Sequence, residues 1–179
     1  SKSKLDLKKI INVIPKISPV EGRFEIIGKI KNKSLVFLDY AHTPDALKTC
    51  LQNIREQFPD KYISILFGCG GDRDKNKRSK MGKIAASFAN KIYLTDDNPR
   101  HEKPSKIRED IKNGIKNRQF VEISNRKTAI KNAIKNLNTG DILIVAGKGH
   151  EMTQQIGNRK IILSDRQIIL NSIKKKNLN

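Results

Sequence analysis

The sequence predicts an α/β fold with a mainly parallel sheet, helices on both of its faces and a C-terminal hairpin. First, short apolar runs recur along the 179 residues, and most are followed by segments with helix signals, a spacing that suits βαβ units. Second, four of these runs end in polar or glycine-rich loops, as strands do where a parallel sheet binds ligands. Third, two extended segments near the C-terminus flank Gly157-Asn158, which indicates a hairpin.

The expected strands are short and apolar. A first strand covers 24–30, and five further apolar runs follow it at 35–38, 62–67, 91–94, 120–123 and 142–146. The hairpin uses 154–156 and 159–163. A helix-like segment follows each of the first four of the five further runs, so the arrangement is Rossmann-like.

Helix signals support this order of elements. Thr43-Pro44-Asp45 offers a cap, a first-turn proline and an acid near the positive end of the helix dipole. Pro104-Ser105 begins another helix, and a last helix is expected over 165–175. A further helix presents one apolar face, and Gly140 is expected to end it. That face consists of Ala129, Ile130, Ala133, Ile134 and Leu137.

The N-terminal segment is expected to be separate from this domain. Residues 5–14 carry a helical apolar stripe, and Pro15 and Pro19 end it and make a linker. We therefore place a domain boundary near Glu21. Because the first residue is Ser1 and not Met, we expect the chain to be a piece of a longer protein.

The net charge of +19 suggests a nucleic-acid partner, and other features argue against one. The lysines are spread through helix-like segments together with many Asn and Ile, as in a genome-wide compositional drift. Aromatic residues make up only 5%, Trp is absent, and neither a stacking platform nor zinc-finger spacing is present. We expect no specific nucleic-acid binding and keep a basic nucleic-acid-binding module as an alternative.

The sequence also bears on compartment and metals. No stretch approaches the roughly 18 apolar residues that span a membrane, and the N-terminus lacks the apolar core of a signal peptide. Two cysteines, Cys50 and Cys69, are too few for a disulfide framework and suit a reducing cytoplasm. Since His42, His101 and His150 lack ligand spacing, we expect no metal site. The protein is expected to be cytoplasmic, with no membrane partner.

The most informative motif is Thr-Asp-Asp-Asn-Pro-Arg at 95–100, directly after an expected strand. Pro99 fixes the backbone before Arg100. Asp97 and Asn98 are suited to accept hydrogen bonds from an ammonium, and Arg100 to bind a carboxylate through two parallel bonds. A ligand with both groups is an amino acid. The alternative is a solvated turn, in which Asp, Asn and Pro are ordinary residues.

Three other strand ends carry loops of similar character, Asp39–Asp45, Gly68–Asp74 and Gly147–Glu151. Because the carboxyl ends of parallel strands share one edge, all four loops are expected to converge on one cleft. None of them matches Gly-x-x-x-x-Gly-Lys-Ser/Thr, so a standard triphosphate-binding loop is absent from this sequence. If the protein uses ATP, that loop comes from elsewhere.

Each of these loops also has a structural alternative. Asp39 suits a cap of the following helix, and His42 a satisfied loop histidine. The three glycines within 68–71 suit turns or a close approach of another group to the backbone. Lys148 suits either solvent exposure or phosphate contact, and Glu151 the first turn of a helix.

In this order the loops resemble the C-terminal domain of the Mur ligases of peptidoglycan synthesis. The resemblance runs from about 22 to 167, with departures at Asn76, where the family often has Gly, and at Met152-Thr153, where it commonly has acidic and aromatic residues. The matching segments are 22–25 (Gly-Arg-Phe-Glu), 39–47, 67–74, 95–100, 145–151 and 164–166 (Ser-Asp-Arg).

The resemblance implies a three-domain, ATP-dependent amide-forming ligase. Residues 1–21 would be the tail of the central ATPase domain and a linker, and 22–179 the C-terminal, amino-acid-binding domain. The similarity is strongest to the branch that adds meso-diaminopimelate to UDP-N-acetylmuramoyl-L-alanyl-D-glutamate. ATP and Mg²⁺ would be bound mainly by the central domain, and we expect a monomer. A stand-alone amino-acid-binding domain is the alternative.

The resemblance also implies roles for single residues. No catalytic residue is assigned within this chain, and arginine at position 100 marks users of diaminopimelate rather than lysine. Contacts to ATP are implied for Arg23, Asp39 and His42. The residues implied to bind diaminopimelate are Arg73, Asp97, Asn98, Pro99, Arg100, Gly147 and Glu151.

Overall fold

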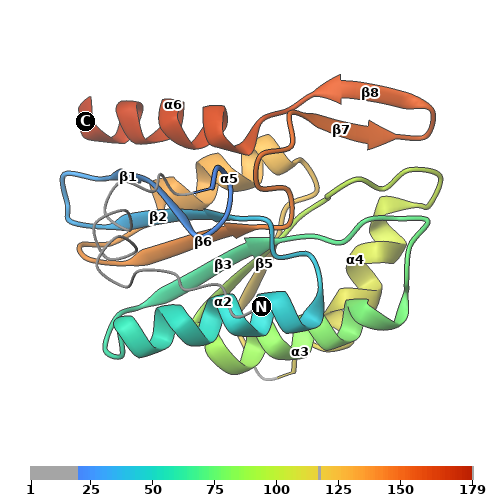
Figure 1. Ribbon diagram of the computed structural model, residues 1–179, viewed down its shortest axis with the longest axis horizontal. Coiled ribbons are helices and arrows are strands. Elements are labelled where there is room, and N and C mark those ends of the chain that lie inside the picture. The colour runs from blue at the N-terminus through green and yellow to red at the C-terminus, as the bar shows by residue number, and fades with distance from the viewer. Residues whose placement is uncertain (1–19, 117, 179) are drawn as a thin grey trace, which may run out of the picture.

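A six-stranded sheet organises the protein, whose computed structural model describes residues 20–116 and 118–178 (Figure 1). The strand order is β1-β2-β6-β3-β4-β5, with β1 antiparallel to β2 and every other neighbouring pair parallel. The strands are β1 (Glu25–Lys29), β2 (Leu35–Asp39), β3 (Ile63–Phe67), β4 (Lys91–Leu94), β5 (Phe120–Glu122) and β6 (Ile142–Ala146). The predicted strands are confirmed to within about two residues.

The helices cover both faces of the sheet, as predicted. One apolar core joins α2, α3 and α4 to side chains such as Ile65, and the other joins α5 and α6 to the opposite face at Leu66. Successive residues of a strand point to opposite faces, so each buried strand serves both cores. The helices are α2 (Pro44–Gln57), α3 (Asn76–Phe88), α4 (Pro104–Lys112), α5 (Arg126–Lys135) and α6 (Asp165–Leu178).

Strand register aligns the carboxyl ends of the parallel strands. Asp39 at the end of β2 is the partner of Ala146 at the end of β6, and Phe67 at the end of β3 is the partner of Leu94 at the end of β4. The loops that follow these strands therefore leave the sheet at one level. The predicted convergence of the four polar loops on one edge is confirmed.

Two helix termini show how well local signals work. Thr43 caps α2 as predicted, because its hydroxyl accepts a hydrogen bond from the Ala46 amide (3.3 Å). The expectation that Gly140 ends α5 is wrong. The helix ends at Lys135, and Gly140 lies in the turn before β6 with φ at +77° and its amide bonded to Asn32 O.

A two-stranded hairpin follows the sheet and lies beside its carboxyl edge. It consists of β7 (Thr153–Ile156) and β8 (Arg159–Ile162), in agreement with the sequence pattern. Ile156 also forms an isolated bridge with Arg100, which joins the hairpin to the motif that follows β4. The hairpin is thus part of the site's framework.

The expected helix over 5–14 lies outside the described residues. Among the described residues, no helix combines the length and the apolar character that crossing a membrane requires.

Candidate functional site

A cleft of about 540 Å³ lies at the carboxyl edge of the sheet, and all four predicted loops contribute to its wall. Of the residues predicted to bind ligands, Pro99, Arg23 and Asp39 do not line it. Those that do are His42, Arg73, Asp97, Asn98, Arg100, Gly147 and Glu151. Residues up to 111 positions apart in the sequence, Tyr40 and Glu151, therefore meet around one cavity.

The glycine-rich loop after β3 packs directly on the loop after β4. A Cβ atom at Gly68 would lie 2.3 Å from Thr95 O, and one at Gly71 would lie 2.0 Å from Pro99 O. Any side chain at these positions would displace the neighbouring backbone. The expected close approach is confirmed, and the approaching group is the motif at 95–100.

Arg100 is held in an unusual conformation that presents its guanidinium to the cleft. Its φ is +49°, a left-handed value that is rare for residues other than glycine. Its Nη1 donates to Gly71 O (2.8 Å) and its backbone amide to Gln155 O (3.1 Å). Within the described ranges it has no ion-pair partner, and its Nε and Nη2 make no hydrogen bond. That edge of the fork is suited to a carboxylate.

A buried lysine organises the acceptors of the cleft. Lys148 is fully buried, and its Nζ donates to Asn98 Oδ1 (3.1 Å) and to Glu151 Oε2 (2.7 Å). Asn98 Nδ2 also donates to Glu151 Oε2 (3.0 Å). The interpretation of Lys148 as solvent-exposed is wrong, because its side chain is fully buried and its ammonium has acceptors within the fold. Its contact with a phosphate stays a prediction.

Glu151 stays ionised in this setting. Burial raises the pKa of its carboxyl, but the hydrogen bonds from Lys148 and Asn98 and the charges of Lys148 and Arg126 outweigh burial and lower the pKa overall. The alternative that places Glu151 in the first turn of a helix is wrong, since it lies in the loop before β7. A carboxylate thus lines the same cleft as Arg73 and Arg100.

Arg126 and Asp165 form a buried ion pair beneath the site, which sequence analysis missed. Both side chains are fully buried, and Arg126 Nη2 donates to Asp165 Oδ2 (2.7 Å) and to Ala146 O (2.9 Å). Arg126 Nη1 lies 4.0 Å from Asp97 Oδ2. The pair therefore connects the ends of β4 and β6. The only sequence signal was the motif at 164–166, whose partner 39 residues away no local pattern reveals.

Arg23 and His42 lie at one rim of the cleft, around Tyr40. The Arg23 guanidinium carbon is 5.3 Å from the Tyr40 ring centroid. The His42 and His150 rings lie 4.6 Å and 5.4 Å from the same ring. A guanidinium beside aromatic rings in this way is suited to an anionic ligand with a flat ring.

Asp39 holds the backbone next to Tyr40 and Arg23 through hydrogen bonds to its carboxylate. Its Oδ2 accepts from the Phe24 amide (2.7 Å), and its Oδ1 accepts from the Ala41 amide (2.7 Å). The alternative that Asp39 caps α2 is wrong, because Thr43 is the cap. Asp39 therefore fixes the backbone next to Arg23.

Further basic side chains border the cleft on the α3 side. Arg73 is exposed and bonded only to its neighbour's carbonyl, Asp72 O (3.2 Å), among the described residues. Lys77 and Lys80, which sequence analysis did not single out, also line the cleft. Cys69 contributes no nucleophile, because burial raises the pKa of its thiol to about 12.

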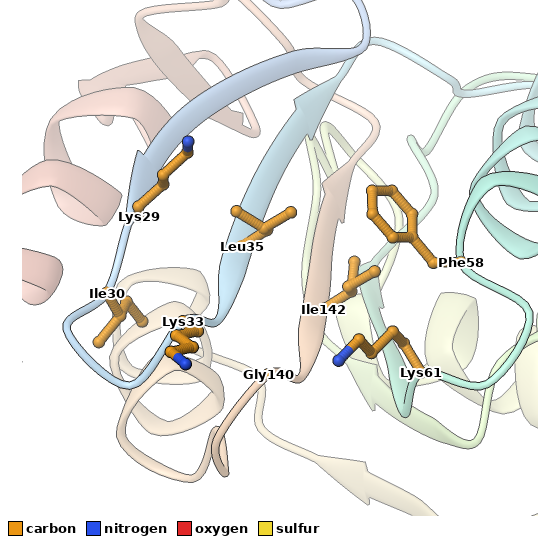
Figure 2. A pocket seen from close by; sticks show the side chains of 8 residues that line it. All are labelled: Lys29, Ile30, Lys33, Leu35, Phe58, Lys61, Gly140 and Ile142. Carbon is orange, nitrogen blue, oxygen red and sulfur yellow. The ribbon is translucent and has the colours of Figure 1, made fainter.

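A second cleft of about 430 Å³ lies at the opposite edge of the sheet, where the parallel strands β2 and β6 begin (Figure 2). Leu35, Phe58 and Ile142 form its apolar middle, and Lys29 and Lys61 are among the lysines around it. No carboxylate or amide side chain lines this cleft within the described residues. It lacks the mixed charges that mark the carboxyl edge. No group of three or more His, Cys, Asp or Glu side chains in the described part of the chain is placed to hold a metal ion.

Comparison with known families agrees with this geometry. The pattern of the family "Mur ligase, glutamate ligase domain" matches residues 22–149. The chain belongs to this family. The matched range contains three of the four loops in full and part of the fourth.

Two individual relatives within the family share nearly half of their aligned residues with this chain. UDP-N-acetylmuramoyl-L-alanyl-D-glutamate--2,6-diaminopimelate ligase from Rickettsia felis is 47% identical over 165 residues, which cover 92% of this chain and 30% of the relative. The protein of the same name from Buchnera aphidicola subsp. Acyrthosiphon pisum is 45% identical over 170 residues, 94% of this chain and 34% of the relative. The chain spans about a third of the length of these relatives.

Solved structures show the same domain. A structure of a UDP-N-acetylmuramoyl-L-alanyl-D-glutamate--2,6-diaminopimelate ligase superposes with a TM-score of 0.80 at 36% identity, covering 98% of this chain and 36% of the other. A murein peptide ligase from Psychrobacter arcticus shares the fold alone, with a TM-score of 0.63 at 18% identity over 90% of this chain and 32% of the other.

Proposed function

We propose that the chain is the C-terminal domain of an ATP-dependent ligase that adds meso-diaminopimelate to UDP-N-acetylmuramoyl-L-alanyl-D-glutamate. The observation that carries this proposal is the cleft at the carboxyl edge. Its lining combines Arg100, which has no ion-pair partner among the described residues, with the ionised Glu151 and the amide of Asn98. Relatives at 45% to 47% identity carry the name of that enzyme.

The cleft matches the chemistry of the amino acid. Diaminopimelate has a reacting amine and, at its far end, an ammonium and a carboxylate. We assign the distal carboxylate to the free edge of Arg100, with Arg73 nearby, and the distal ammonium to Asp97 and Glu151. Asn98 orients Glu151, as their 3.0 Å contact supports. Pro99 and Gly147 shape the backbone, because a Cβ at Gly147 would lie 2.9 Å from Asp97 Oδ2.

ATP is proposed to bind between this domain and a central domain that lies outside the chain. Arg23 and His42 would contact the nucleotide from the rim, and Asp39 would act through the backbone that it holds. Mg²⁺ and the triphosphate would be held mainly by the central domain. Bringing the two domains together would place the amine of diaminopimelate against the activated carboxyl group.

The domain assignment belongs to the same proposal. Residues 1–21 are assigned to the tail of the central domain and a linker, and 22–179 to the C-terminal domain, which the family match beginning at residue 22 supports. We also propose a cytoplasmic monomer that binds UDP-N-acetylmuramoyl-dipeptide through its other domains and has no specific nucleic-acid partner.

Steady-state kinetics of the full-length protein test the proposal. We expect ATP-dependent amide formation with meso-diaminopimelate, and activity with L-lysine lower by a factor of about 10⁴, because lysine leaves Arg100 desolvated without a partner. The isolated 179-residue chain is expected to hydrolyse no ATP. Equal use of L-lysine, or turnover by the isolated chain, would contradict the proposal.

A further inference from the structure

Two residues beside His101, Arg100 and Asp72, have left-handed backbone conformations. Arg100 has φ at +49°, and Asp72, which faces it from the glycine-rich loop, has φ at +52°. Such angles are unfavourable for most residues other than glycine, and above all for an arginine, so surrounding contacts must hold them. The contacts that impose them here therefore decide where the Arg100 guanidinium points.

Two elements hold this backbone from opposite sides. From the glycine-rich loop, the Gly71 amide donates to Asn98 O (2.9 Å). From the hairpin, Gln155 O accepts from the Arg100 amide (3.1 Å), and the Gly157 amide donates to Arg100 O (2.6 Å). The arginine is thus held between the glycine-rich loop and the tip of the hairpin.

His101 joins these two elements to each other. Its ring contacts Asp72 Oδ2 through Nδ1 (2.8 Å) and Asn158 Oδ1 through Nε2 (2.9 Å), and its amide donates to Asp72 Oδ2 (3.3 Å). Both ring partners are oxygen acceptors, so the doubly protonated ring satisfies them together. One side chain therefore ties the glycine-rich loop to the turn between β7 and β8.

The charges around the ring favour this bridge. The hydrogen bonds to Asn158 and Asp72 and the charge of Asp72 raise the pKa of His101. Asp72 is the charged group that faces the ring from the glycine-rich loop, and its amide is in turn bonded to Glu102 Oε1 (2.7 Å). Arg100 is the neighbouring cation on the same segment, and the hairpin contributes the uncharged amide of Asn158.

We propose that His101 is a positioning residue that sets the placement of Arg100, and hence the affinity for the distal carboxylate of the amino acid, by bridging Asp72 and Asn158. This inference rests on the proposed function. It adds the hairpin turn, about 57 residues further along the chain, to the apparatus that reads the substrate.

The test is the kinetics of the full-length enzyme with separate titration of each substrate. His101→Ala is expected to raise KM for meso-diaminopimelate by about 2- to 10-fold, the range for two exposed charge-assisted contacts. Values of kcat and of KM for ATP and for the nucleotide-peptide are expected to stay unchanged. Lys160→Ala, an exposed hairpin position without a described hydrogen bond or ion pair, is the control and leaves all values unchanged.

A double-mutant cycle separates the bridge from a general structural effect. Asn158→Asp gives the imidazolium a charged partner, so KM for meso-diaminopimelate is expected to fall below that of the wild type. In a His101→Ala background the same substitution is expected to bring no gain. Equal gains in both backgrounds, or a KM increase shared by all three substrates in His101→Ala, would overturn the inference.

The same kinetics distinguish a failure of the proposed function from a failure of the inference about His101. If the wild type does not use meso-diaminopimelate, the proposed function is wrong. If the wild type uses it and Arg100→Ala abolishes this, while His101→Ala behaves like Lys160→Ala, only the role of His101 is wrong.

Discussion

The two clefts lie at opposite edges of the same sheet and differ in what their charged groups contact. At the carboxyl edge, Lys148 is fully buried between Asn98 and Glu151, and Arg100 is fixed by backbone carbonyls. At the opposite edge, Lys33 and Lys61 are exposed around an apolar floor (Figure 2). The volumes are similar, about 540 and 430 Å³, so size does not distinguish the clefts.

The comparison shows that arrangement of partners, not volume, marks a binding site. Side chains that already hold one another need little reorganisation when a ligand arrives. A flexible, solvated lysine loses side-chain entropy on binding and gains little from one exposed contact. Variants at matched positions of the two edges make this difference measurable.

The largest expected effect comes from removing the buried cation beneath the carboxyl edge. Arg126→Met leaves the fully buried Asp165 without its partner, and breaking a buried pair costs about 3–5 kcal/mol. Urea denaturation of the protein would measure this loss. Lys131→Met, an exposed position on the same helix, is the control and should stay within about 0.5 kcal/mol of the wild type. Equal stability of the two variants would show that the pair contributes nothing.

Truncating Arg100 should cost nearly as much, in activity rather than stability. Arg100→Ala is expected to lower kcat/KM for meso-diaminopimelate, with a loss of transition-state stabilisation of about 2–5 kcal/mol, since it removes one half of a desolvated charge pair. Arg100→Lys should restore little, because a point charge does not reproduce the planar fork. Lys61→Ala at the opposite cleft is the matched control and should retain wild-type kinetics. Near-normal turnover by Arg100→Ala would remove the basis of the substrate assignment.

Adding one methyl group at each edge should separate site geometry from stability. Gly71→Ala places a Cβ 2.0 Å from Pro99 O, so the backbone at position 71 must move. Because the carbonyl of residue 71 accepts the hydrogen bond from Arg100 Nη1, KM for meso-diaminopimelate should rise. Gly140→Ala meets only the flexible end of Lys61 at 3.1 Å, and its left-handed backbone costs about 1–2 kcal/mol of stability. Its kinetics should not change. A higher KM in Gly140→Ala, or an unchanged one in Gly71→Ala, would contradict this view.

The smallest expected effect is the pH dependence of the His101–Asp72 pair. Hydrogen bonds raise the pKa of His101 above its ordinary value of 6.5, and the contact with His101 lowers the pKa of Asp72. A raised histidine pKa means that the stabilisation is complete below about pH 6.5 and is lost as the pH rises through the folded-state pKa. The difference in unfolding free energy between wild type and His101→Ala should therefore shrink from pH 6 to pH 9. A constant difference would show that charge does not contribute.

Much of the fold followed from short-range patterns. Apolar runs predicted each strand, and Thr43 with Pro44 predicted the start of α2, because capping is decided within one helical turn. The four loops at strand ends predicted their own convergence, since parallel strands end at one edge. Gly140 misled because a left-handed glycine suits several kinds of turn, and the nearby sequence does not say which element it ends.

What the sequence by itself determined is the order of elements, the family resemblance and the set of polar groups at one edge. What only the tertiary structure decided is which groups pair. Lys148 meets Asn98 across 50 residues, because β6 lies beside β3, whose other neighbour β4 leads to Asn98. Arg126 meets Asp165 across 39 residues, because α5 and α6, which begin at these two residues, pack on the same face of the sheet. These pairs are also necessary for stability, since a buried charge that has lost its hydration destabilises the fold unless a partner lies beside it.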